Sequence, residues 1–113
     1  MPNLIGREAT LSSQTEQQES RLVPTESVQI LVVEDSVTQA LNLRFLLQKR
    51  GYAVSVCHSG EEALRYLKEH KPTLIISDIV MPGIDGYELC RLIRQDRQLA
   101  DVPIILMTAL SDP

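Results

Sequence analysis

Short strand-like runs alternate with segments of helical periodicity from Val28 onward, and this alternation constrains the fold more than any other feature. The predicted strands are rich in Val, Ile and Leu and cover residues 28–33, 53–57, 73–77 and 104–107. The segments between them repeat apolar residues at helical spacing and cover residues 36–50, 59–71 and 86–96. Strands that alternate with helices favour a parallel sheet covered on both faces, with right-handed crossovers.

Capping residues stand where this pattern needs them. Gly51 follows the first helical segment at a C-cap position, and Ser59 and Glu62 form a capping box at the start of the second. Asp85 ends a turn-rich loop and is placed to cap the third helix. We expect Asp85 to serve only as a cap.

Residues 1–27 differ from the rest of the chain. The stretch 12–20 has no apolar face, and Pro24 follows it. Such a segment cannot bury enough surface to offset its ordering entropy. A chain of 113 residues is long enough for one domain. We therefore predict a disordered polar leader over residues 1–27 and one domain over residues 28–113, with a short partner-docking helix as the alternative for the leader.

Charge and hydropathy argue against several classes of protein. The net charge of −4 disfavours a nucleic-acid surface, which is normally basic. No apolar run approaches the roughly 20 residues of a membrane span, and the first residues lack a signal-peptide pattern. We expect a cytoplasmic protein whose domain binds neither nucleic acid nor membrane. Cys57 and Cys90 lie far apart in sequence and are predicted to be reduced thiols.

Polar residues end three of the four predicted strands. Glu34 and Asp35 follow the first strand, Asp78 the third and Thr108 the fourth. The carboxyl ends of parallel strands meet at one edge of the sheet, where open α/β sheets bind ligands. One acid at a strand end is more often a cap or a solvated residue. Three that converge repel one another unless a cation joins them, so their convergence indicates function.

A hard divalent ion with oxygen ligands suits such a cluster, and Mg²⁺ suits few carboxylates with several waters. A central carboxylate can act as a nucleophile toward phosphorus, and the ion shields the incoming charge. A hydroxyl such as that of Thr108 can donate a hydrogen bond to a phosphoryl oxygen. The predicted chemistry is phosphoryl transfer to a carboxylate.

Three motifs resemble those of bacterial two-component response-regulator receiver domains. Residues 30–36 resemble the first strand with its acidic pair, and residues 77–86 resemble the phosphorylation loop, D-x-x-M-P-x-x-x-G. Residues 103–109 resemble the fourth strand with its switch threonine. The motifs occur in the order of that family and at similar separations, and the match runs from about Val28 to the last residue.

This resemblance implies a role for each matching position. Asp78 would accept the phosphoryl group of a histidine kinase or phosphotransfer protein, and it would be a Mg²⁺ ligand. Asp35 would bind Mg²⁺ directly, Glu34 through a water and Val80 through its backbone carbonyl. Thr108 would hydrogen-bond to the phosphoryl group and act as a switch. The implied protein is a phosphoprotein of a phosphorelay, not an enzyme with a separate substrate, and its fold is the flavodoxin-like, doubly wound parallel sheet.

The chain departs from the family pattern at its end. Receivers continue with a fourth helix, a fifth strand that brings a lysine and an aromatic switch residue, and a fifth helix, about 40 residues in all. Lys71 is no substitute for that lysine because it precedes the third strand, at the opposite edge. We therefore expect a C-terminally incomplete receiver with strand order 2-1-3-4. Its fourth strand, residues 104–107, would be an apolar edge open to self-association.

Other functions remain open. A receiver-like interaction module that takes no phosphoryl group is the main alternative. A phosphatase of the haloacid dehalogenase type needs an acid two positions after its nucleophile, where this chain has Val80, and a flavodoxin relative needs a hydroxyl- or glycine-rich loop in place of Glu34 and Asp35. His58 could reach the edge of the site, although a solvated loop histidine is the commoner outcome.

Overall fold

The computed structural model describes residues 27–108, which form four strands and three helices in strict alternation. The predicted leader lies outside this range except for Ser27, as do residues 109–113. The elements are β1 (Gln29–Val33), α1 (Val37–Lys49), β2 (Ala53–Cys57), α2 (Gly60–Leu67), β3 (Leu74–Asp78), α3 (Gly86–Gln95) and β4 (Ile104–Met107). Within these residues no helix is long and apolar enough to cross a membrane.

All strand pairs are parallel, in the order β2-β1-β3-β4, which confirms the predicted sheet. The central strands β1 and β3 pair with each other, and the register places Val33 opposite Ser77. On the outer side of β3, Asp78 pairs with Met107. The strand ends that carry polar residues therefore lie side by side at one edge of the sheet.

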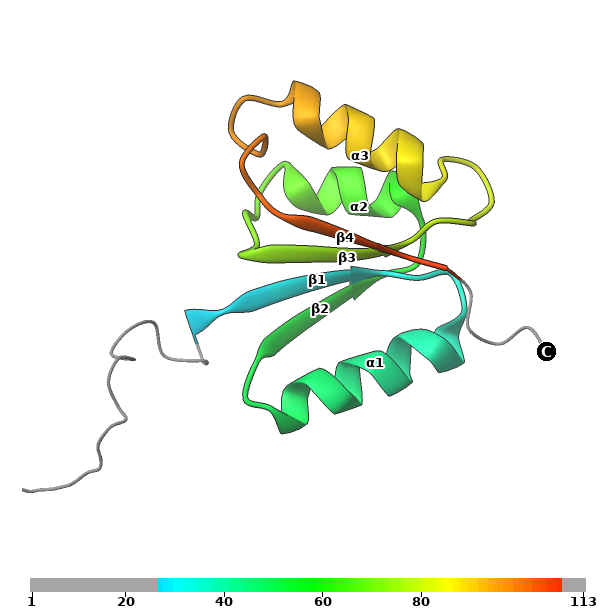
Figure 1. Cartoon of the computed structure of the whole chain (residues 1–113), viewed down its shortest axis with the longest axis vertical. Helices are drawn as coiled ribbons and strands as arrows, with labels where there is room; N and C mark the ends of the chain where they lie inside the picture. The colour runs from blue at the N-terminus through cyan, green and yellow to red at the C-terminus, as the bar shows by residue number, and fades with distance from the viewer. Residues whose placement is uncertain (1–26, 109–113) are drawn as a thin grey trace, which may run out of the picture.

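The helices cover both faces of the sheet, α1 on one side and α2 with α3 on the other (Figure 1). Under α2 and α3, the strands contribute Leu31, Val33 and Ile75 to a large apolar core that also contains Leu89 and Ile93 of α3. Under α1, a smaller core is built on Ile30, Val32 and Ile76. Alternate residues of β1 point to opposite faces, so this strand is buried from both sides, as its continuous apolar sequence predicts.

The helix starts follow the predicted capping residues. The side chain of Ser59 accepts a hydrogen bond from the Glu62 N–H at the start of α2, and Asp85 accepts one from the Glu88 N–H at the start of α3. Asp85 thus acts as a cap, as expected. Several boundaries differ by one residue, and the second helix, predicted to reach residue 71, ends at Leu67. The third strand is predicted to end at Ser77, whereas β3 includes Asp78, because Asp78 still pairs with β4.

Candidate functional site

Three acidic side chains meet at the carboxyl edge of the sheet. Glu34 and Asp35 follow β1, and Asp78 ends β3. One carboxylate oxygen of each lies within 4.8 Å of the corresponding oxygens of the other two. Glu34 and Asp78 are buried and Asp35 is exposed. The convergence that strand polarity predicts is therefore present in the fold.

The Glu34 residue is held by neighbours on both sides. Its side-chain Oε2 accepts a hydrogen bond from the Ser36 N–H at 3.0 Å. Its backbone N–H donates to the Cys57 carbonyl at 2.9 Å, and its own carbonyl lies 3.0 Å from Nδ1 of His58. A carbonyl only accepts, so in this contact Nδ1 of His58 carries the proton. The turn after β1 is thus fixed by the residues at the end of β2.

Burial raises the pKa of the Glu34 carboxyl, and the nearby charges of Asp78 and Asp35 raise it further, against the lowering effect of the Ser36 N–H. Burial in a medium of low dielectric disfavours a charge, and so does a second negative charge close by. A cation at this place would remove both effects. The electrostatics of the cluster therefore favour a bound cation.

Asp78 occupies the centre of the edge because its strand lies between β1 and β4. Its Oδ1 is buried and, among residues 27–108, is the one buried side-chain nitrogen or oxygen atom without a hydrogen-bond partner. Its backbone carbonyl accepts a hydrogen bond from the buried Ser77 hydroxyl at 2.9 Å. A buried carboxylate oxygen without a partner is costly, and a metal ion or a transferred group would satisfy it.

The loop after Asp78 is anchored on both sides of Val80. The Ile79 N–H donates to the Met107 carbonyl at 2.9 Å, and the Met81 side chain is buried in the core under α2 and α3. The Gly86 N–H closes the loop on the Ile79 carbonyl at 2.7 Å. A Cβ atom at Gly86 would lie 2.4 Å from the Asp78 carbonyl oxygen, so only glycine permits this approach. The Val80 side chain, between these anchors, is 71% exposed.

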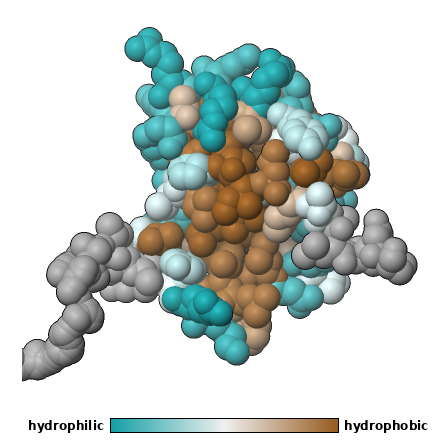
Figure 2. Space-filling model, viewed as in Figure 1, coloured by the Kyte–Doolittle hydropathy of each residue, from teal (hydrophilic) through white to brown (hydrophobic). Residues whose placement is uncertain are grey.

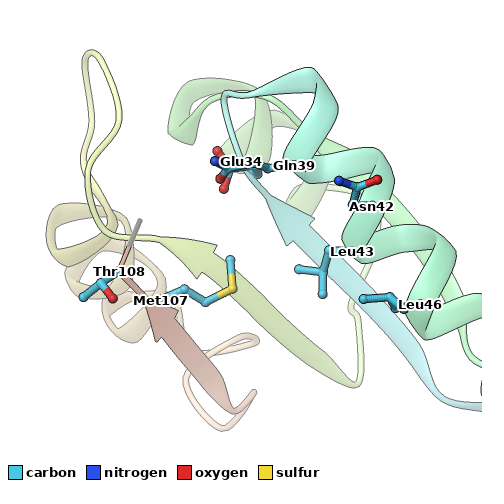
Figure 3. Close-up of a pocket in the computed structure, with 7 residues that line it drawn as sticks. All are labelled: Glu34, Gln39, Asn42, Leu43, Leu46, Met107 and Thr108. Atoms are coloured by element: carbon cyan, nitrogen blue, oxygen red, sulfur yellow. The ribbon is translucent and has the colours of Figure 1, made fainter. Parts of the chain in front are cut away.

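Thr108 directly follows β4 and is exposed. It lines a cavity of about 300 Å³ that lies between β4 and α1. Figure 3 shows Thr108 on the β4 side of this cavity and Glu34 on the α1 side, with Leu43, Leu46 and Met107 among the lining residues. Thr108 is therefore at the same edge as the acids and lies across this cavity from Glu34.

The two histidines and Lys71 fall into two groups by their place in the fold. His58 is exposed, as expected, yet its ring also supports Glu34, which strand pairing alone could have indicated because Val33 pairs with Cys57. The His70 ring stacks on the Tyr66 ring with 4.2 Å between their centroids. Nζ of Lys71 forms an ion pair with Oδ1 of Asp101 at 3.4 Å. His70 and Lys71 both lie beyond the end of α2 and before β3, at the opposite edge of the sheet.

The donor set fits a hard divalent cation. It offers carboxylate oxygens from Glu34, Asp35 and Asp78 within a few ångströms, one of them buried and unpartnered, together with an anchored loop that carries the Val80 carbonyl. Carboxylate and carbonyl oxygens are the ligands that Mg²⁺ and Ca²⁺ prefer in proteins. The doubly wound parallel sheet and the acidic cluster at its carboxyl edge are those of a receiver domain.

Comparison with known proteins agrees with this class. Residues 30–113 match the family described as the response regulator receiver domain. The chain is 43% identical over 83 residues to the transcriptional regulatory protein AfsQ1 of Streptomyces coelicolor, and the match covers 74% of this chain and 36% of that protein. It is 33% identical over 79 residues to the protein PilH of Pseudomonas aeruginosa, which covers 70% and 65%. The chain belongs to the response-regulator receiver family.

Solved structures show the same fold. The receiver domain of a signal transduction histidine kinase from Syntrophus aciditrophicus has a TM-score of 0.70 and 48% identity, over 76% of this chain and 65% of that chain. The chemotaxis response regulator CheY4 of Vibrio cholerae has a TM-score of 0.70 and 31% identity, over 76% and 72%. The chain spans about a third of the length of the first curated relatives.

Proposed function

We propose that this chain is the phosphoacceptor receiver of a two-component phosphorelay and that Asp78 takes the phosphoryl group. The observation that supports it best is the buried, unpartnered carboxylate oxygen of Asp78 among two further acids. In the transfer, one oxygen of Asp78 bonds to phosphorus while the bond between phosphorus and the donor histidine nitrogen breaks, and the imidazole leaves with a proton. The product is an acyl phosphate. The chain is acceptor rather than enzyme, because no separate substrate turns over.

The metal in this proposal is Mg²⁺. Asp35 and Asp78 would hold it directly, Glu34 through a water and Val80 through its backbone carbonyl. When bound, the ion neutralises charge on the carboxylates and on the incoming phosphoryl oxygens. The chain's own residues do the positioning: Ser36 and His58 hold Glu34, Ser77 holds Asp78, and Thr108 donates a hydrogen bond to a phosphoryl oxygen.

The partner in this proposal is a histidine kinase or a phosphotransfer protein, in the cytoplasm. Proteins similar to this chain include a transcriptional regulatory protein and the receiver domain of a signal transduction histidine kinase. A chain that binds such partners without accepting phosphate is the alternative, and the labelling experiment separates the two.

The experiment is labelling with radioactive acetyl phosphate in the presence of Mg²⁺. We expect a hydroxylamine-sensitive label on Asp78 that Asp78→Asn abolishes and Asp85→Asn keeps, because Asp85 serves only to cap α3. Label that persists in Asp78→Asn would contradict the assignment. Absence of label in the unmodified chain would favour the interaction module.

A further inference from the structure

The first turn of α2 packs against the loop that follows the proposed phosphoacceptor. A Cβ atom at Gly60 would lie 2.9 Å from Cβ of Ile84, so the helix and the loop are in close contact there. The next residue, Glu61, reaches the same loop with its side chain: its Oε2 accepts a hydrogen bond from the Ile84 N–H at 3.2 Å. The two residues are 23 positions apart, so the contact joins separate parts of the chain.

The loop conformation makes room for the Glu61 carboxylate. Gly83 has φ +73°, a left-handed conformation that favours glycine. A Cβ atom at Gly83 would lie 2.6 Å from Oε2 of Glu61. The carboxylate therefore lies over the backbone at Gly83 and bonds to the next N–H. Both the conformation and the space at Gly83 suit a side chain from α2.

This contact adds a hydrogen bond to a part of the loop that is otherwise held by packing. Its other anchors are at Ile79, Met81 and Gly86. In the described part of the chain, Glu61 supplies the one hydrogen bond that reaches the backbone of residues 81–84 from another element. The Val80 carbonyl lies between the anchored start of the loop and this segment. A bond at Ile84 therefore limits how far the loop can move relative to Asp78.

We propose that Glu61 is a positioning residue of the acidic site, which holds the loop between β3 and α3 so that Val80 stays beside Asp78. The proposal rests on the proposed function for its effect on phosphorylation, although not for the contact itself. Glu61 acts through the loop backbone and touches neither metal nor phosphoryl group. Its role differs from that of Glu62, whose side chain accepts a hydrogen bond from the His58 N–H at 2.7 Å.

The test compares three variants of the 113-residue chain. Glu61→Ala removes the acceptor, and Glu61→Gln removes the charge but keeps an acceptor oxygen at the same reach. Glu88→Ala is the matched control, because Glu88 lies in the first turn of α3 and its side chain binds Arg91 of its own helix. Three quantities are measured at temperatures below the unfolding transition. They are amide hydrogen exchange at Ile84, the dissociation constant for Mg²⁺ from amide NMR shifts, and the rate of labelling by acetyl phosphate.

In Glu61→Ala we expect exchange at Ile84 and the Mg²⁺ dissociation constant to rise about fivefold, the usual effect of one net hydrogen bond. Labelling should slow to a similar degree. Glu61→Gln should stay close to the parent chain in all three, and so should Glu88→Ala. A purely structural role would change the melting temperature without changing Mg²⁺ affinity, and that result would overturn the proposal.

Three further outcomes are decisive. If Glu61→Gln behaves like Glu61→Ala, the charge and not the hydrogen bond is responsible, and the proposal is wrong. If no variant, the parent included, takes label while Ile84 exchange and Mg²⁺ affinity change as expected, the proposed function fails and the role of Glu61 stands. If the parent is labelled normally and Ile84 exchange is unchanged in Glu61→Ala, the proposed function stands and the role of Glu61 is wrong.

Discussion

Carboxylate oxygens of Glu34 and Asp78 lie within 4.8 Å of each other at the ends of two neighbouring strands, and each residue is only 4% exposed. Two buried acids so close together destabilise the fold when both are charged. The arrangement therefore favours ion binding at the expense of stability, and several measurable consequences depend on it.

Removal of one of these charges should stabilise the metal-free chain. We expect Asp78→Asn to raise the free energy of unfolding by about 1 kcal/mol at neutral pH with a chelator present, because active-site residues are commonly suboptimal for stability. Urea denaturation measures the change. Asp85→Asn is the control, because Asn and Asp cap helices equally well and its stability should stay the same. A less stable Asp78→Asn would show that the charge is already compensated within the protein.

Mg²⁺ should bind at this edge, and its binding should depend on Asp35. Titration of Mg²⁺ should move the amide NMR signals of residues near Asp35, Asp78 and Val80. Asp35→Ala should remove those shifts, since an exposed carboxylate beside two buried ones is the natural point of entry for a hydrated ion. Asp96→Ala changes an exposed acid beyond α3 and should leave the titration unaltered. Unchanged shifts in Asp35→Ala would rule out the proposed ligand set.

The stabilising effect of Mg²⁺ should grow with pH. Burial raises the pKa of Glu34 above its ordinary value of 4.5. A carboxyl whose pKa is raised by folding favours the folded state while protonated, and this contribution is lost as pH rises through the raised pKa. The metal-free chain should therefore lose stability above about pH 4.5 on account of Glu34. Mg²⁺ favours the deprotonated cluster, so it should offset that loss.

Melting temperatures with Mg²⁺ and with chelator, compared at several pH values, measure this effect. In Glu34→Gln the difference between the two conditions should depend much less on pH. An equally steep dependence in Glu34→Gln would assign the titration to another group.

The two cysteines should differ in reactivity. Cys57 ends β2 with 2% of its surface exposed, and burial raises the pKa of its thiol to about 11, with a smaller contribution from the Glu62 charge. The thiolate is the reactive form, so Cys57 should not be alkylated in the folded chain near pH 8. Cys90 is partly exposed and should react faster. Mass spectrometry after brief exposure to iodoacetamide measures both, and equal rates in the folded chain would contradict the predicted burial of Cys57.

The edge of β4 should promote self-association. In the described sheet β4 pairs only with β3, and the Ile105 side chain is 50% exposed. Figure 2 shows hydrophobic residues gathered across the middle of the face on which β4 lies in Figure 1. An unpaired apolar strand recruits other strands, and a lysine on it prevents this. We expect the 113-residue chain to associate with rising concentration in sedimentation experiments, and Ile105→Lys to reduce this.

Phe45→Lys is the control for non-specific hydrophobic association, because Phe45 is also exposed, at 61%, but lies on α1. It should leave the association in place. A monodisperse parent chain with cooperative unfolding would show that the four strands are sufficient without a further partner.

The sequence alone determined the order of the elements and the polarity of the sheet. Apolar runs such as residues 30–33 are too short for helices, and helical spacing with caps at Ser59 and Asp85 specified where helices begin. Because parallel strands all end at one edge, the positions of Glu34 and Asp78 in the sequence were enough to predict that they converge. These features depend on local periodicity and on a general rule of topology.

Only the tertiary structure decided how the acids are held and how much each is buried. The contacts of His58 with Glu34 and of Glu61 with Ile84 join residues 24 and 23 positions apart. The first contact depends on how β2 pairs with β1, the second depends on the packing of α2 against the loop after β3, and no local pattern encodes either. The unpartnered oxygen of Asp78 is likewise a property of the assembled core, because burial is set by every element that surrounds the strand end.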